Sequence, residues 1–288
     1  MLKAWLELAR ISNLPTAWTN VLAGRLLAGG QLQDQRLLWL LLGGSLLYSG
    51  GMILNDAADA GYDREHRKER PIPRGAVSVG AAWSGGLSFM VFGVAACVLG
   101  GGAGFGLSLA LVAAILGYNL YHKPWAGSVI VMGSCRTLLY LVAASGVLGL
   151  DAVRWSLDLW SSAVSLGCYV VGLSLLARQE SRPKESLRGV FRWLPICLLL
   201  MPTPIGLSVF SGGVTACALP VLFLSLVAGS VSLVRRGGQF IGQGVGWLLA
   251  GIVVVDALAI SNVSLEIAIA VACGAPLLRL WQRKIAAT

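Results

Sequence analysis

The segment Leu37–Gly75 reads LLWLLLGGSLLYSGGMILNDAADAGYDREHRKERPIPRG. Its first part, Leu37–Ile53, is a continuous apolar run close to the ~20 residues with which an α-helix crosses the hydrocarbon core of a membrane. Its second part, Leu54–Gly75, concentrates aspartates, glutamates, arginines and lysines in an otherwise apolar chain. The first part therefore predicts a membrane span, and the second part predicts a charged loop beside it.

The rest of the chain is similarly apolar. Of its 288 residues, 56% are hydrophobic and 12% are charged, and the mean hydropathy is +0.76. These values exclude the ordinary soluble classes of protein. Continuous apolar runs predict helices, because backbone groups in lipid must bond within their own segment. The expected spans lie near residues 14–30, 36–55, 79–99, 103–121, 127–149, 157–176, 191–210 and 214–234. The segment 244–282 holds one or two more.

Basic residues occur in every second connection between the expected spans, and this pattern predicts the topology. Loops that remain in the cytoplasm are enriched in lysine and arginine. The N-terminus and the cap loops 54–78 and 177–192 are therefore expected in the cytoplasm. The same enrichment explains the net charge of +9, so we expect no nucleic-acid partner. Charges inside the expected spans are few, and an Arg25–Asp256 pair within the bundle would satisfy two of them.

Four side chains with oxygen ligands follow the second expected span. They are Asn55, Asp56, Asp59 and Asp63. If the helix continues into the loop, their spacing places them on one face, where the like charges repel. Oxygen ligands without histidine or cysteine favour a hard cation, magnesium or calcium. Magnesium commonly joins one or two carboxylates to a substrate phosphate, and the neighbouring arginines can neutralise that phosphate. The alternative is a solvated loop in which Asp63 pairs with Arg67.

Several stretches resemble the UbiA superfamily of intramembrane prenyltransferases. Asn55–Asp63, NDAADAGYD, resembles the family's NDxxDxxxD motif, and Arg70–Gly75, RPIPRG, resembles its RPxxxG continuation. The stretch ARISNLPTAWTNVLAG, with Arg10 and Asn13, resembles its first span. The stretch YNLYHKPWAGSVIVMGSCR resembles its connection between spans four and five, and contains Tyr118, Lys123, Gly133 and Arg136. The resemblance covers most of the chain.

This resemblance implies both a fold and a reaction. The implied fold is an all-α, multi-pass transmembrane helical bundle of about nine to ten helices around a central lipid-accessible cavity, here a single domain over residues 1–288. The implied enzyme is a magnesium-dependent prenyltransferase that moves an isoprenyl group from a prenyl diphosphate to a lipid-soluble, aromatic acceptor. Its expected location is the cytoplasmic (inner) membrane of a bacterium, with membrane lipid as a further partner.

The motifs and the resemblance together assign roles to individual residues. The expected catalytic residues are Asp56, Asp59 and Asp63. The expected magnesium ligands are Asn55, Asp56, Asp59, Asp63 and Glu180. The expected substrate-binding residues are Asn13, Arg64, Arg70, Tyr118, Lys123, Arg136, Arg178 and Arg182. Arg136 belongs to this set partly because an arginine inside a span is costly unless it faces a cavity or a partner.

A second acidic motif, expected after the sixth span, departs from the family pattern. The stretch Ala177–Glu185 reads ARQESRPKE, and no aspartate occurs between Asp158 and Asp256. Glu180 either replaces the missing ligands or pairs with Lys184. In this respect the chain resembles the UbiA-like membrane proteins encoded in bacterial Ebo clusters. The alternative function is therefore a non-catalytic UbiA-like binder or carrier of an isoprenoid-like metabolite.

Overall fold

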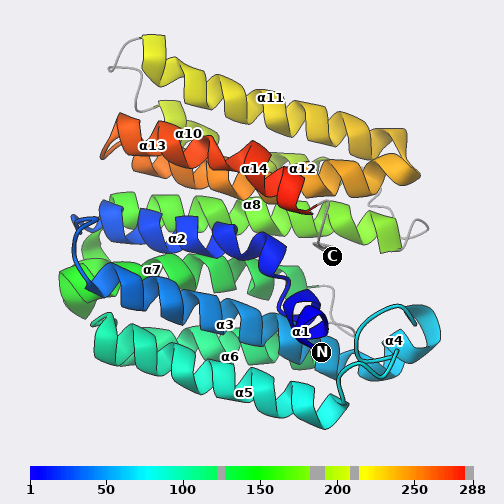
Figure 1. The fold of residues 1–288 in the computed structure, drawn as a ribbon. Helices are drawn as coiled ribbons and strands as arrows, with labels where there is room; N and C mark the ends of the chain where they lie inside the picture. Colours follow the sequence, from blue (N-terminus) through cyan, green and yellow to red (C-terminus); the bar gives the residue numbers. More distant parts are fainter. Residues whose placement is uncertain (122–126, 182–191, 208–213, 283–288) are drawn as a thin grey trace.

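A computed structural model describes residues 1–121, 127–181, 192–207 and 214–282, and all regular structure in these residues is helical. The first elements are α1 (Leu2–Leu8), η1 (Ile11–Asn13), α2 (Leu14–Leu27), α3 (Arg36–Ala58), α4 (Ala60–His66), α5 (Val79–Ala95), η2 (Ala96–Gly100) and α6 (Phe105–Tyr121). The following elements are α7 (Ser128–Trp155), α8 (Leu157–Ser181), α9 (Leu194–Leu199), α10 (Thr203–Leu207), α11 (Val214–Arg236), α12 (Gln239–Ile260), α13 (Leu265–Ala272) and α14 (Gly274–Gln282). Figure 1 shows the long helices side by side in one bundle.

Several of the described helices have the lengths of membrane spans. Seven are long and apolar enough to cross a membrane, and two shorter apolar helices cover Phe105–Tyr121 and Leu194–Ile205. The prediction of an all-α, multi-pass membrane bundle is therefore confirmed. The segment 244–282, for which the sequence left one or two spans open, belongs to two candidate spans, Gln239–Ile260 and Leu265–Gln282.

Glycines allow neighbouring helices to approach closely. A Cβ atom on Gly50 of α3 would lie 2.9 Å from the carbonyl oxygen of Gly86 on α5, and one on Gly43 would lie 2.8 Å from that of Gly93. On α2, a Cβ atom at Gly24 would overlap the backbone carbonyl of Tyr140 on α7. Small residues at helix contacts are a common basis of helix association in lipid, so these positions set the spacing of α2, α3, α5 and α7.

A small apolar cluster packs the charged loop against one end of the bundle. Leu8 of α1, Ile53 of α3 and Ile72 of the loop are almost fully buried in it. Figure 1 shows α1 and α4 at the end of the bundle where α8 and α11 also terminate. We call this the cap end. The sequence predicts that it faces the cytoplasm.

Candidate functional site at the cap end

The acidic motif lies where α3 passes into α4. Asp59 caps the end of α3 in a near-helical conformation. The backbone N–H of Asp59 donates to the carbonyl of Asn55, and that of Asp63 donates to the carbonyl of Asp59, both at 2.9 Å. The helical path therefore continues through the motif, as the spacing of its acids predicts.

Two arginines bind the carboxylates of this motif. Arg10 Nη2 donates to Asp56 Oδ1 at 3.3 Å, and Arg70 Nη1 donates to the same oxygen at 3.2 Å. Arg70 Nη1 also donates to Asp63 Oδ2 at 2.8 Å. Both carboxylates are almost fully buried. The alternative in which Asp63 pairs with Arg67 is wrong, because Arg70 from the RPxxxG stretch is its partner. We call Arg10, Asp56, Asp63 and Arg70 the motif cluster.

The backbone of Arg10 is itself unusual. Its φ is +44°, in the left-handed region. Among the described residues, Arg10 is the only non-glycine residue with a positive φ. Such a conformation costs a non-glycine residue of the order of 1 kcal/mol or more and is found most often at functional sites. Here it lies at the start of η1, from where the Arg10 side chain reaches Asp56. In the sequence, Arg10 was singled out only because the stretch that contains it resembles the first span of the UbiA superfamily.

Burial raises the pKa of the Asp63 carboxyl above its ordinary value. The neighbouring Arg70 lowers this pKa through its charge and its hydrogen bond, whereas the negative charges of Asp59 and Asp56 add to the increase. The effect of burial is the largest of these, so Asp63 keeps its proton more readily than an exposed aspartate does.

The described residues do not hold a metal ion by themselves. No group of three or more histidine, cysteine, aspartate or glutamate side chains among them has a geometry that fits a metal. Asp63 is occupied by Arg70, and both arginine bonds to Asp56 fall on its Oδ1. The oxygen donors still suit magnesium, which needs only one or two carboxylates when a phosphate completes its coordination. The oxygen donors of the described motif therefore fit a metal that arrives with a diphosphate.

Side chains from α6 and α8 lie near the motif cluster. The Tyr118 side chain on α6 is half-buried and lies within electrostatic reach of Arg178, Arg10 and Asp59. Arg178 Nη2 on α8 donates to Ser128 Oγ at 2.6 Å. The structure therefore brings together predicted site residues that are far apart in the sequence.

An asparagine that sequence reasoning missed joins α6 to the motif. Asn55 Nδ2 donates to Asn119 Oδ1 at 3.3 Å, and Asn119 Nδ2 donates to the carbonyl of Gly51 at 3.0 Å. Asn119 is buried. A lone asparagine in the apolar run of α6, next to Tyr118, was the available signal for its role.

The remaining predicted site residues are placed differently. Asn13 is buried, and its Oδ1 accepts a hydrogen bond from Gln282 Nε2 of α14 at 2.9 Å. Arg64 is exposed on α4, and among the described residues it forms no ion pair with the acids of the motif. Lys123, Arg182 and the side chain of Glu180 lie outside the described residues, so their roles stay predictions.

A second polar cluster lies inside the bundle. The fully buried Asp256 of α12 accepts hydrogen bonds from Thr19 Oγ1 at 2.5 Å, Asn20 Nδ2 at 2.7 Å and the Tyr140 hydroxyl at 2.5 Å. Arg136 and Thr16 are joined to these residues by further hydrogen bonds. We call the whole set the Asp256 network: Thr16, Thr19, Asn20, Arg136, Tyr140 and Asp256.

Arg136 belongs to this network through neutral partners. Its Nη1 donates to Asn20 Oδ1 at 2.7 Å and its Nη2 to Thr16 Oγ1 at 2.9 Å. Its guanidinium carbon lies 5.3 Å from the ring centroid of Tyr48. The predicted Arg25–Asp256 pair does not form, because Arg25 pairs with Asp34.

A helical membrane bundle with an NDxxDxxxD motif at one end is the class of protein that the fold and the site define. The model of the UbiA prenyltransferase family matches residues 17–260 of the chain. Since this match covers most of the sequence, the chain belongs to the UbiA prenyltransferase family.

Relatives with curated functions match shorter parts of the chain. Digeranylgeranylglyceryl phosphate synthase from Methanopyrus kandleri is 34% identical over 142 residues, which cover 46% of this chain and 51% of that protein. The same enzyme from Methanoculleus marisnigri is 33% identical over 96 residues, covering 33% and 34%. Protoheme IX farnesyltransferase from Aquifex aeolicus is 28% identical over 162 residues, covering 53% and 56%. The chain thus spans about a third to a half of the length of these relatives.

Solved structures of UbiA homologues have the same fold over almost the whole chain. The apo structure of a homologue from Aeropyrum pernix K1 has a TM-score of 0.68 at 18% identity, covering 88% of this chain and 97% of that one. A homologue from Archaeoglobus fulgidus bound to GPP and Mg²⁺ has a TM-score of 0.62 at 16% identity, covering 94% and 99%. At these identities the likeness shows the fold.

Proposed function

We propose that this protein is a magnesium-dependent prenyltransferase that moves an isoprenyl group from a prenyl diphosphate to a lipid-soluble, aromatic acceptor. The observation that carries the proposal is the motif cluster, in which Arg10 and Arg70 are held on buried carboxylates at the cap end. The membership of the UbiA family supports the reaction class. We further propose that the membrane is the cytoplasmic membrane of a bacterium and that the cap end and N-terminus face the cytoplasm.

The arginines of the site are suited to bind the diphosphate. A guanidinium group matches phosphate geometry and forms short, charge-assisted hydrogen bonds. Arg10 and Arg70 are already oriented by Asp56 before a substrate arrives, and Arg178 is oriented by Ser128. Because the donors are positioned in advance, little reorganisation is needed when negative charge grows on the departing diphosphate.

Asn55, Asp56 and Asp59 are the residues that would hold magnesium together with the diphosphate. When bound, the metal supplies Lewis-acid stabilisation of the leaving group. The homologue from Archaeoglobus fulgidus, whose structure is described as bound to GPP and Mg²⁺, supports this assignment. Asp63 has a different proposed role, since Arg70 occupies it. It positions that arginine for the phosphate.

The proposed chemistry is an alkylation. The bond between the first isoprenyl carbon and the diphosphate oxygen breaks, and the diphosphate leaves with the electron pair. The allylic cation is attacked by the π electrons of the acceptor, a new carbon–carbon bond forms, and the acceptor loses a proton. The apolar walls of the bundle keep water from the cation, and the rings of Tyr48 and Tyr118 can stabilise it through their π faces.

A non-catalytic binder or carrier of an isoprenoid-like metabolite is the second candidate. The observation that favours it is the departure of the second motif, because no aspartate occurs between Asp158 and Asp256. A protein of this kind would keep the arginines of the motif cluster and bind the diphosphate without breaking its carbon–oxygen bond.

Turnover of labelled geranyl and farnesyl diphosphates, with a panel of lipid-soluble aromatic acceptors, tests the proposal. The parent protein is compared with Asp56→Ala and Asp59→Ala. The control is Glu65→Gln, because Glu65 is exposed on α4 and makes no ion pair with the arginines of the motif cluster. We expect at least about 100-fold less product from the aspartate variants, since metal stabilisation of a leaving group contributes several kcal/mol.

Two results decide between the candidates. Equal product from the parent and both aspartate variants would refute the proposed site. Absence of product from the parent, with tight diphosphate binding that Arg70→Gln weakens, would favour the carrier.

A further inference from the structure

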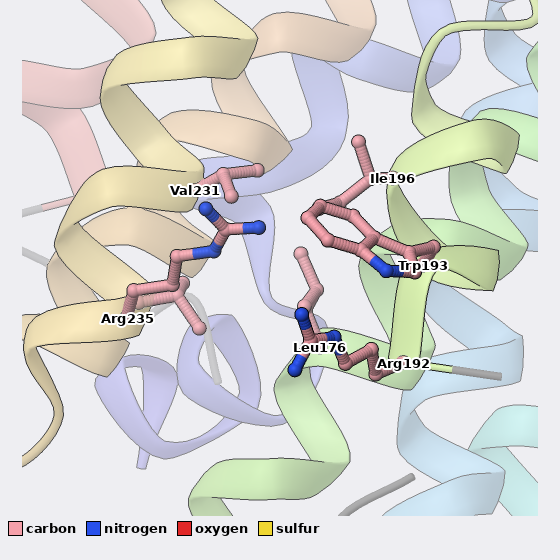
Figure 2. Close-up of a pocket in the computed structure, with 7 residues that line it drawn as sticks. Leu176, Arg192, Trp193, Ile196, Val231 and Arg235 are labelled. Atoms are coloured by element: carbon pink, nitrogen blue, oxygen red, sulfur yellow. The ribbon is translucent and has the colours of Figure 1, made fainter. Parts of the chain in front are cut away.

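A cavity of about 310 Å³ lies between α8, α9 and α11 near the cap end. Its polar lining consists of Arg192, Trp193 and Arg235, and its apolar lining includes Leu176, Ile196 and Val231. Figure 2 shows the two guanidinium groups reaching into the space between α11 and the Trp193 ring. The cavity is therefore basic at one part of its wall and apolar at the other.

Both arginines gather on the same indole. The guanidinium carbon of Arg192 lies 4.9 Å from the Trp193 ring centroid, and that of Arg235 lies 5.3 Å from it. Within the described ranges, neither arginine forms an ion pair. Two like charges held close together repel each other, and this repulsion is relieved when an anion binds between them. Guanidinium groups bind phosphate oxygens particularly well.

This cavity is separate from the candidate site for the diphosphate. Leu176 lines the cavity, whereas Arg178 faces the other way and donates to Ser128 of α7. Residues two positions apart on an α-helix point about 200° apart. The cavity and the motif cluster therefore lie on opposite sides of α8.

The position and the apolar wall indicate what kind of anion fits. Val231 and Arg235 are one helical turn apart on α11, so their side chains are neighbours on the helix surface. A ligand whose phosphate binds Arg235 would therefore have apolar surface directly beside that phosphate. Further along the same helix, Val221, Leu222 and Leu224 are exposed, as expected for a helix that faces lipid. Tryptophans such as Trp193 concentrate at the level of lipid headgroups.

We propose that Arg192, Trp193 and Arg235 form a binding site for an anionic glycerophospholipid. The headgroup phosphate binds between the two guanidinium groups, and an acyl chain follows the apolar wall of Ile196, Val231 and Leu176. Basic pockets between membrane helices on the cytoplasmic side commonly bind anionic lipid headgroups. This site does not depend on prenyl transfer, so it can fail or hold independently of the proposed reaction.

Lipid retention by the full chain in detergent, measured by native mass spectrometry, tests this proposal. The delipidated protein is titrated with phosphatidylglycerol and, separately, with phosphatidylcholine of the same acyl chains. We expect phosphatidylglycerol to bind at least about fivefold more tightly. Arg192→Gln and Arg235→Gln should each weaken its binding about fivefold, as expected when one basic residue near an anionic headgroup is lost, and the double variant should weaken it more than about tenfold.

Matched controls separate local from general effects. Arg236→Gln removes the neighbouring charge, which does not line the cavity, and should leave binding within about twofold of the parent. The double lysine variant Arg192→Lys with Arg235→Lys keeps the charge and should retain most of the binding, which shows that the site still folds. Equal weakening by Arg236→Gln, or parental binding by the double glutamine variant, would overturn the proposal. So would displacement of the lipid by equimolar inorganic phosphate, because the phosphate alone would then be the ligand.

Discussion

The motif cluster and the Asp256 network both contain aspartate and arginine but differ in what their carboxylates bind. In the motif cluster, Asp56 and Asp63 bind arginines directly, and the arginine side chains keep 13–19% of their surface exposed. In the Asp256 network, a fully buried carboxylate binds neutral donors, and Arg136 is connected to it through Asn20. Arginines that remain partly exposed can exchange one anion for another, whereas a fully buried network has no solvent to replace a lost partner. The first is therefore suited to bind substrate and the second to hold helices in place.

The largest predicted effect is that of Asp256→Ala. The change leaves Thr19, Asn20 and Tyr140 without their acceptor and leaves Arg136 inside the bundle without a nearby negative charge. Removal of one member of a buried charged network costs about 3–5 kcal/mol. The free energy of unfolding of the purified protein, measured by titration with a denaturing detergent, should fall by this amount.

Two comparisons make this prediction specific. Asp158→Ala removes an exposed acid from the first turn of α8 and should cost less than about 1 kcal/mol. Asp256→Asn combined with Arg136→Gln should cost less than the sum of the two single changes, by roughly 1 kcal/mol or more. Additive costs would mean that Arg136 and Asp256 do not interact.

The next effect in size is that of Gly24→Ala. The added Cβ atom would overlap the backbone carbonyl of Tyr140, so α2 and α7 must separate. The hydroxyl of the same tyrosine donates to Asp256. Overpacking of this kind costs about 1–3 kcal/mol, measured in the same detergent titration. Gly117→Ala on α6 is the control, because its Cβ atom would meet nothing within 4 Å. It should be neutral or stabilising by up to about 1 kcal/mol.

Asp56→Asn should weaken substrate binding strongly and lower the stability only slightly. Arg10 and Arg70 remain partly exposed to water, and Arg70 keeps Asp63, so the cost in stability should be about 1 kcal/mol or less. Binding of geranyl diphosphate in the presence of magnesium, measured by calorimetry, should nevertheless weaken at least about tenfold, because the variant lacks a carboxylate that we propose as a magnesium ligand. A large loss of stability with unchanged binding would reverse the roles that we assign to the two clusters.

The smallest predicted effect is a dependence on pH that arises in the motif cluster. Because burial holds the pKa of Asp63 above its ordinary value, the folded protein binds this proton more readily than the unfolded chain does. The stability contributed by Asp63 is fully present below the unfolded pKa of about 4, and it is lost as the pH rises through the folded pKa. Melting temperatures across this window should decline less steeply in Asp63→Asn than in the parent. Identical slopes would show that Asp63 does not titrate in this way.

The two clusters also differ in how far the sequence predicts them. The acids of the motif cluster lie within a few residues of one another, and their helical spacing and the resemblance both pointed to one face. Two partners of Asp256 lie on α2, 236 and 237 positions earlier, and the third, Tyr140, lies on α7. No local sequence pattern connects these residues. The Arg25–Asp256 pair was expected only because the two residues carry opposite charges inside the expected spans. Arg25 instead reaches Asp34, because the chain reverses at Gly29, where φ is +81°.

The hydrogen bonds that join α2 to α12 and η1 to α14 have a consequence for biosynthesis. Thr19 and Asn20 enter the membrane in the first span, but Asp256 is made 236 residues after Asn20, which takes roughly 10–50 s at ordinary rates of translation. Asn13 gains its hydrogen-bond partner still later, when Gln282 of α14 is made. During that interval the polar face of α2 has no acceptor from α12. The first span therefore cannot complete its native polar contacts until α12 and α14 have been made.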